Sequence, residues 1–175
     1  MTLQSFDALP EEALKEILAL TEAKKRLDLQ EQAQNKFMPF AHHVYENFIE
    51  GRHHRVIAEK LEAVARGELK RLIINMPPRH SKSEFASYLM PAWFLGRNPK
   101  LKIIQATHNT ELAVRFGRKV RDLIDDPAYR EIFPETNLKE DNKGAGKWGT
   151  DKGGEYFAAG VGAAVTGRGA DLFVI

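Results

Sequence analysis

The 175-residue sequence contains no cysteine. That absence excludes a disulfide framework, thiolate-ligated zinc and thiol catalysis, and it is typical of proteins from a reducing cytoplasm. The sequence also lacks an apolar run approaching the ~20 residues that a membrane-spanning helix needs, and its polar, acidic start is unlike a secretory signal. We therefore expect a soluble protein with no membrane partner.

An excess of one sign of charge is also missing, because 26 lysines and arginines oppose 24 aspartates and glutamates. A formal net charge of +2 neither requires a nucleic acid partner nor excludes one. The 43% of hydrophobic residues is enough to build the core of one globular domain.

Helical spacing dominates the first part of the chain. After the acidic turn at Glu11 and Glu12, apolar residues recur every three or four positions, and the polar continuation to Gln34 predicts a loosely packed leader or an arm. Two further amphipathic stretches, near residues 40–48 and 57–65, predict core-facing helices, the second closed by Gly67. We divide the chain into a helical leader, residues 1–37, and a main domain, residues 38–175.

The main domain then alternates between strand and helix patterns. Leu72–Met76 and Leu101–Thr107 are apolar runs typical of buried strands. Each precedes a predicted helix, the first over Glu84–Leu95 and the second from Thr110, as its cap, to about Asp125. This order predicts an α/β fold with a mainly parallel central sheet flanked by helices.

The last part of the domain is rich in glycine. Nine of the thirteen glycines lie between Gly144 and Gly169, which predicts short strands and tight turns. The final residues, Asp171–Ile175, have the pattern of another buried strand.

The segment between the first predicted strand and its helix has the features of a phosphate-binding loop. Backbone N–H groups of such a loop surround an anion, and the following helix adds the positive end of its dipole. Lys82 stands where a lysine contacts the β and γ phosphates, and Ser83 where a hydroxyl ligates Mg²⁺. The predicted ATP and Mg²⁺ site comprises Pro78, Arg79, His80, Ser81, Lys82, Ser83 and Glu84.

This loop departs from the standard motif, which has glycine where Met76 and Ser81 stand here. The Cβ of Ser81 would strain the loop if this residue requires a positive φ. A proline-bounded turn that carries surface charges is the alternative interpretation, and the eight residues Met76–Ser83 alone leave it open.

Further motifs accompany the loop at ordered places along the chain. They are Arg66–Glu68 before it, Leu72–Glu84 through it, then Pro91–Trp93, Leu95–Pro99, Ala106–Asn109, Glu111–Ala113, Phe133–Pro134, Trp148, Gly153–Gly154 and Thr166–Asp171. Over about residues 38 to 175, this pattern resembles the large terminase subunits of tailed phages. The leader shares little of the signal.

The resemblance implies a P-loop NTPase fold of the additional-strand type, truncated here at the Walker B strand, with a nuclease domain in the intact protein. It implies an ATPase motor that packages double-stranded viral DNA into procapsids in the host cell cytoplasm. The implied partners are DNA, the portal protein and the small terminase subunit, with a homo-oligomeric ring as the assembly. Two alternatives stay open: a helicase-like or recombination P-loop ATPase, and a nucleotide-binding fragment without catalytic activity.

The resemblance also implies roles for three residues outside the motif's core positions. Arg79, three residues before Lys82, would face the phosphates as a catalytic residue, and His43 lies in a segment similar to the terminase adenine pocket. Arg168 resembles an arginine that related motors deliver to a neighbouring subunit's nucleotide. The alternative is that Arg168 holds a glycine turn through backbone carbonyls, and both interpretations stay open.

Two other groups favour structural roles. The pairs His42–His43 and His53–His54 lack a carboxylate or thiolate at ligand spacing, so they are not expected to bind metal. Arg115, Arg118 and Lys119 share one helix face, for which a solvated surface is favoured over a DNA contact.

The acids that bind Mg²⁺ and activate water in P-loop ATPases follow the strand that Leu172–Ile175 resembles. Asp171 stands at the opposite end of that strand and does not substitute for them. We therefore expect essentially no ATPase activity from these 175 residues.

Overall fold

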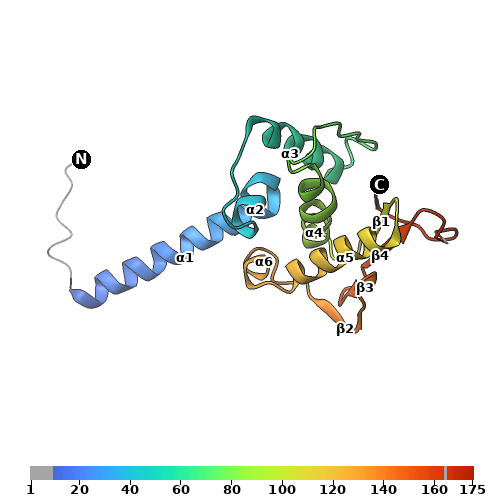
Figure 1. Ribbon diagram of the computed structural model, residues 1–175. Coiled ribbons are helices and arrows are strands. Elements are labelled where there is room, and N and C mark those ends of the chain that lie inside the picture. Colours follow the sequence, from blue (N-terminus) through green and yellow to red (C-terminus); the bar gives the residue numbers. More distant parts are fainter. Residues whose placement is uncertain (1–9, 164) are drawn as a thin grey trace.

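The computed structural model describes residues 10–163 and 165–175, and in it helices flank one five-stranded sheet of order β2-β3-β4-β1-β5 (Figure 1). The helices are α1 (Glu11–Asn35), α2 (Phe37–Val44), α3 (Arg52–Ala65), the π-helical η2 (Glu84–Leu89), α4 (Met90–Arg97), α5 (Thr110–Ile124) and α6 (Pro127–Ile132). The strands are β1 (Lys102–Thr107), β2 (Leu138–Lys143), β3 (Lys147–Thr150), β4 (Glu155–Gly160) and β5 (Leu172–Val174). The α/β fold class is therefore confirmed.

The sheet is mixed rather than mainly parallel, which corrects the expectation from the sequence. β1 pairs in parallel with β4 and with β5, whereas β2, β3 and β4 pair antiparallel. The reason lies in the short connection between β3 and β4, where the Thr150 N–H donates to the Gly154 carbonyl at 3.0 Å. So tight a link joins antiparallel strands only, because parallel strands need a longer crossover.

Leu72–Met76 is extended but is not a strand, so that prediction was wrong. Its side chains alternate between half-buried and exposed, and Ile73 is 93% exposed. A strand exists through hydrogen bonds to a neighbour, and the sheet ends at β5 without including this segment. The last strand was expected to be buried, but Phe173 is 52% exposed at this open edge.

The core lies between the sheet and α5 and continues among the other helices, and two tryptophans fix it in place. The Trp93 indole N–H donates to the Ala33 carbonyl at 2.8 Å, which ties α4 to the end of α1. The Trp148 indole stacks on Tyr156 and donates to the Gly117 carbonyl of α5 at 3.0 Å. A Cβ at position 117 would lie 2.6 Å from the Ala145 carbonyl, so glycine lets α5 approach the sheet.

The helix boundaries agree with the sequence in some places and correct it in others. Gly67, with φ +75°, follows α3 as expected for a C-terminal cap. The cap of α5 is Asn109 rather than Thr110, because the Asn109 side-chain oxygen accepts the Leu112 N–H at 2.8 Å. Pro127 was expected only to end α5, but it also opens α6.

The long helix α1 forms an arm, as the leader's polar pattern suggested. Figure 1 shows it projecting away from the rest of the molecule. Its C-terminal end packs on the rest of the described chain, where Ala33 is fully buried and the Gln34 amide donates to the Ile132 carbonyl at 2.6 Å.

Candidate functional site

The loop before η2 has an unusual backbone. Arg79 has φ +63° and Ser81 has φ +59°, and they are two of the three non-glycine residues with positive φ in the described chain. A left-handed conformation costs a non-glycine residue about 1–2 kcal/mol, and such strained residues cluster at functional sites. The condition under which Ser81 would strain the loop is therefore met.

The helix that follows the loop begins at Lys82. Its first hydrogen bond joins the Phe85 N–H to the Ser81 carbonyl at 2.9 Å. The N–H groups of Lys82, Ser83 and Glu84 therefore have no acceptor within the helix, and they carry the positive end of its dipole. This is the local geometry that binds anions.

Two cations stand free at this helix start. Arg79 and Lys82 are exposed, and within residues 10–163 and 165–175 neither side chain makes a hydrogen bond or an ion pair. Ser83 is exposed beside them. The loop thus combines unpaired N–H groups, unpaired positive charge and a hydroxyl, which is the donor set that a phosphate with Mg²⁺ requires.

Phe85 anchors the loop to the body of the molecule. It is 1% exposed, its ring stacks on His54 at 4.9 Å, and it also contacts Phe37 at 5.3 Å and Phe48 at 5.6 Å. These aromatic contacts join the first turn of the loop helix to α2, to α3 and to the segment between them. The position of Lys82 and Ser83 therefore depends on this packing.

Histidines of α3 also reach the loop. The His80 ring, whose Nδ1 lies 2.8 Å from the Pro78 carbonyl, is 5.7 Å from the His53 ring. Burial and the neighbouring charge of His53 lower the pKa of His54, whose Nδ1 accepts the Gly51 N–H at 2.8 Å. No sequence signal indicated that His53 lies beside the loop, because only the fold brings α3 there.

No group of three or more histidine and acidic side chains is placed to hold a metal ion in the part of the chain that the structure describes.

The Glu84 carboxylate pairs with a lysine of α5, which leaves the Glu84 backbone N–H as its group at the loop. The carboxylate accepts the Lys119 ammonium at 2.8 and 3.0 Å, and that ammonium also lies 4.4 Å from the centre of the Tyr88 ring. Burial, and next the charge of Glu84, raise the pKa of Tyr88 to about 12. Glu84 therefore ties the loop helix to α5, and Lys119 is engaged there, whereas Arg115 and Arg118 stay exposed.

The remaining predicted site residues lie in other surroundings. His43, on α2, has its Nε2 3.1 Å from the Glu131 carboxylate of α6, so its charged neighbour is not part of the loop. The Arg168 guanidinium lies 4.1 Å from the centre of the Phe157 ring on β4. Its backbone N–H donates to the Val165 carbonyl at 3.1 Å.

Comparisons with known proteins do not assign this chain to a family. No protein-family model, no curated protein and no solved structure matches the chain. In the described ranges, no helix has the length and apolar character needed to cross a membrane.

Proposed function

We propose that this chain is the nucleotide-binding part of a terminase large subunit, with a P-loop NTPase fold that drives packaging of double-stranded viral DNA. The observation that carries the proposal is the loop at residues 78–83. There, two strained residues precede a helix start that bears unpaired N–H groups and a free lysine. A simple charged turn has no reason to maintain that strain.

Each loop residue then has a defined task. The N–H groups of Lys82, Ser83 and Glu84 donate to phosphate oxygens, and the Lys82 ammonium neutralises the β and γ phosphates. The Ser83 hydroxyl is the protein's Mg²⁺ ligand. The Arg79 guanidinium stabilises the charge that develops on the γ-phosphoryl group.

The wider assignment rests on the resemblance. It includes the portal protein and the small terminase subunit as partners, a homo-oligomeric ring, and work in the host cytoplasm. For Arg168 to reach a neighbouring subunit's nucleotide, its guanidinium must leave the ring of Phe157. This exchange would make the arginine's availability depend on assembly.

The test is the affinity of the chain for ATP in the presence of Mg²⁺, measured by calorimetric titration. Lys82→Ala should weaken binding about tenfold to a hundredfold, the worth of one hydrogen-bonded charge. Lys100→Ala is the matched control, because Lys100 is an exposed lysine in the turn before β1 and should leave affinity unchanged. Equal affinities for the two variants and the parent chain would refute the assignment.

Hydrolysis is a separate question. We propose that these 175 residues by themselves bind nucleotide without turning it over, because Asp171 stands at the start of β5, where it accepts the Lys102 N–H at 2.7 Å, and not at the carboxyl end where P-loop ATPases place the acids that activate water. Steady-state phosphate release should stay at background with and without DNA. DNA-stimulated release that Lys82→Ala abolishes would overturn this part of the proposal.

A further inference from the structure

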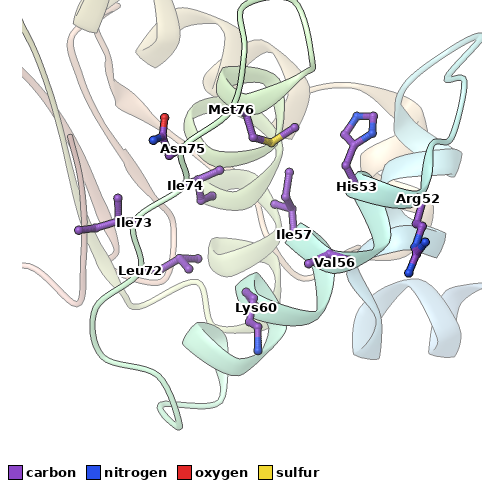
Figure 2. Close-up of a pocket in the computed structure, with 10 residues that line it drawn as sticks. All are labelled: Arg52, His53, Val56, Ile57, Lys60, Leu72, Ile73, Ile74, Asn75 and Met76. Carbon is purple, nitrogen blue, oxygen red and sulfur yellow. The ribbon is translucent and has the colours of Figure 1, made fainter.

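An apolar groove opens between α3 and the extended segment Leu72–Met76. Its cavity of about 600 Å³ has one wall from each element, and Figure 2 shows Leu72, Ile74 and Met76 pointing towards α3. The lining residues from α3 are Arg52, His53, Val56, Ile57 and Lys60.

The groove is apolar inside and positive at its edge. Val56 is 52% exposed, and the partly buried side chains of Leu72, Ile74 and Met76 line the groove with it. Arg52 and Lys60 are exposed beside them and make no ion pair in the described chain. A contiguous exposed apolar surface with a charged rim is typical of an interaction site.

The outer half of α1 has the complementary character. Leu14, Ile17 and Leu18 recur at helical spacing, and Leu18 and Leu20 are 63% and 64% exposed. Glutamates flank this apolar side, because Glu11 stands three residues before Leu14 and Glu22 four residues after Leu18. Residues 11–22 contain four glutamates, at positions 11, 12, 16 and 22, and one lysine, Lys15, so this half of the helix is acidic.

We propose that the outer half of α1 in one copy of this chain lies in the α3 groove of a second copy. The apolar side of the helix enters the groove, and its glutamates meet Arg52 and Lys60 at the rim. The helix does not occupy the groove of its own chain, because Figure 1 shows α1 projecting away from α3. The inference does not depend on the nucleotide site.

This contact is heterologous, because each copy offers one arm and one groove. Successive copies therefore add head to tail, and they form a ring if the rotation closes or a chain if it does not. Met76, in the wall of the groove, is separated from the loop at residues 78–83 by Pro77 alone. An arm bound in the groove thus lies next to the segment that positions the loop.

The experiment is sedimentation velocity over a concentration series with paired variants. Ile17→Glu places a charge in the arm, and Val56→Glu places one in the groove. Both positions are partly exposed, at 39% and 52%, so the fold should tolerate them. Each variant alone should weaken association about tenfold or more, since each removes buried apolar contact. Leu27→Glu, 64% exposed but nearer the body of the molecule, is the control and should associate like the parent chain.

Mixing the two variants gives the sharpest result. The Ile17→Glu chain keeps its groove and the Val56→Glu chain keeps its arm, so the mixture should form one-to-one dimers that neither variant forms alone. Added salt should weaken those dimers, because opposite charges meet at the rim. A monomeric parent chain, a mixture that stays monomeric, or association that survives Val56→Glu would each overturn the proposal.

Discussion

Replacing Ser81 by glycine should make the folded chain more stable. Ser81 has φ +59°, a conformation that costs a residue with a Cβ about 1–2 kcal/mol. Its side chain makes no hydrogen bond in the described chain, so removing the hydroxyl forfeits none. Glycine also has greater freedom in the unfolded state, which offsets about 0.5–1 kcal/mol of that stabilisation. The net expectation is about 0.5–1 kcal/mol of added stability.

Urea denaturation of three variants separates the two contributions. Ser81→Ala keeps the Cβ and should show no such gain. Gly67→Ala is the reverse test, because Gly67 has φ +75° and an added Cβ would meet no atom within 4 Å. Backbone strain should cost that variant about 1–2 kcal/mol and the stiffer unfolded chain should offset about 0.5–1 kcal/mol, so it should lose about 0.5–1 kcal/mol of stability. A Ser81→Gly chain that is less stable than the parent chain, or no more stable than Ser81→Ala, would contradict the strain assigned to Ser81.

Three further predictions concern the surroundings of the loop. Phe85→Ala should lower the free energy of unfolding by about 3–5 kcal/mol, whereas Phe85→Leu should cost clearly less, both measured by urea denaturation. The neutral form of His54 is favoured in the folded state, so its contribution to stability is present above the unfolded pKa of about 6.5 and lost as the pH falls below it. That loss is at most about 1.4 kcal/mol per pH unit, and His54→Gln should flatten it in a pH series of urea melts. Arg79→Ala, in a longer protein that hydrolyses ATP, should lower kcat more than it raises KM, and a change in KM alone would contradict its role.

Local sequence patterns predicted the elements that have a clear hydrophobic run or a capping residue. β1 is an apolar run that becomes an interior strand, paired with β4 on one side and β5 on the other, and α3 ends where Gly67 permits a left-handed residue. The same reasoning failed for Leu72–Met76, because an apolar run specifies an extended, partly buried chain but not a hydrogen-bonded neighbour. Its half-buried side chains pack towards α3, and its exposed Ile73 has no covering layer.

The candidate site also has some features that the sequence predicted and others that only the tertiary structure creates. The strain at Ser81 followed from a missing glycine, which is visible in the sequence. The contact of His80 with His53 and the anchoring of Phe85 by Phe37 are tertiary, since they join segments separated by tens of residues. The helical spacing of Lys119 did not predict the partner of its side chain. Lys119 shares a basic face with its neighbours, but its ammonium is paired with Glu84.

We propose that the backbone N–H groups at the start of the loop helix bind a polyphosphate. Amide proton NMR detects this binding when adenosine and ATP are added separately in the presence of Mg²⁺. We expect ATP to shift the amide signals of Lys82, Ser83 and Glu84 strongly, adenosine to leave them nearly unchanged, and Lys82→Ala to reduce the ATP effect greatly. Unshifted signals for these three amides, at ATP concentrations that saturate binding elsewhere on the chain, would contradict this proposal.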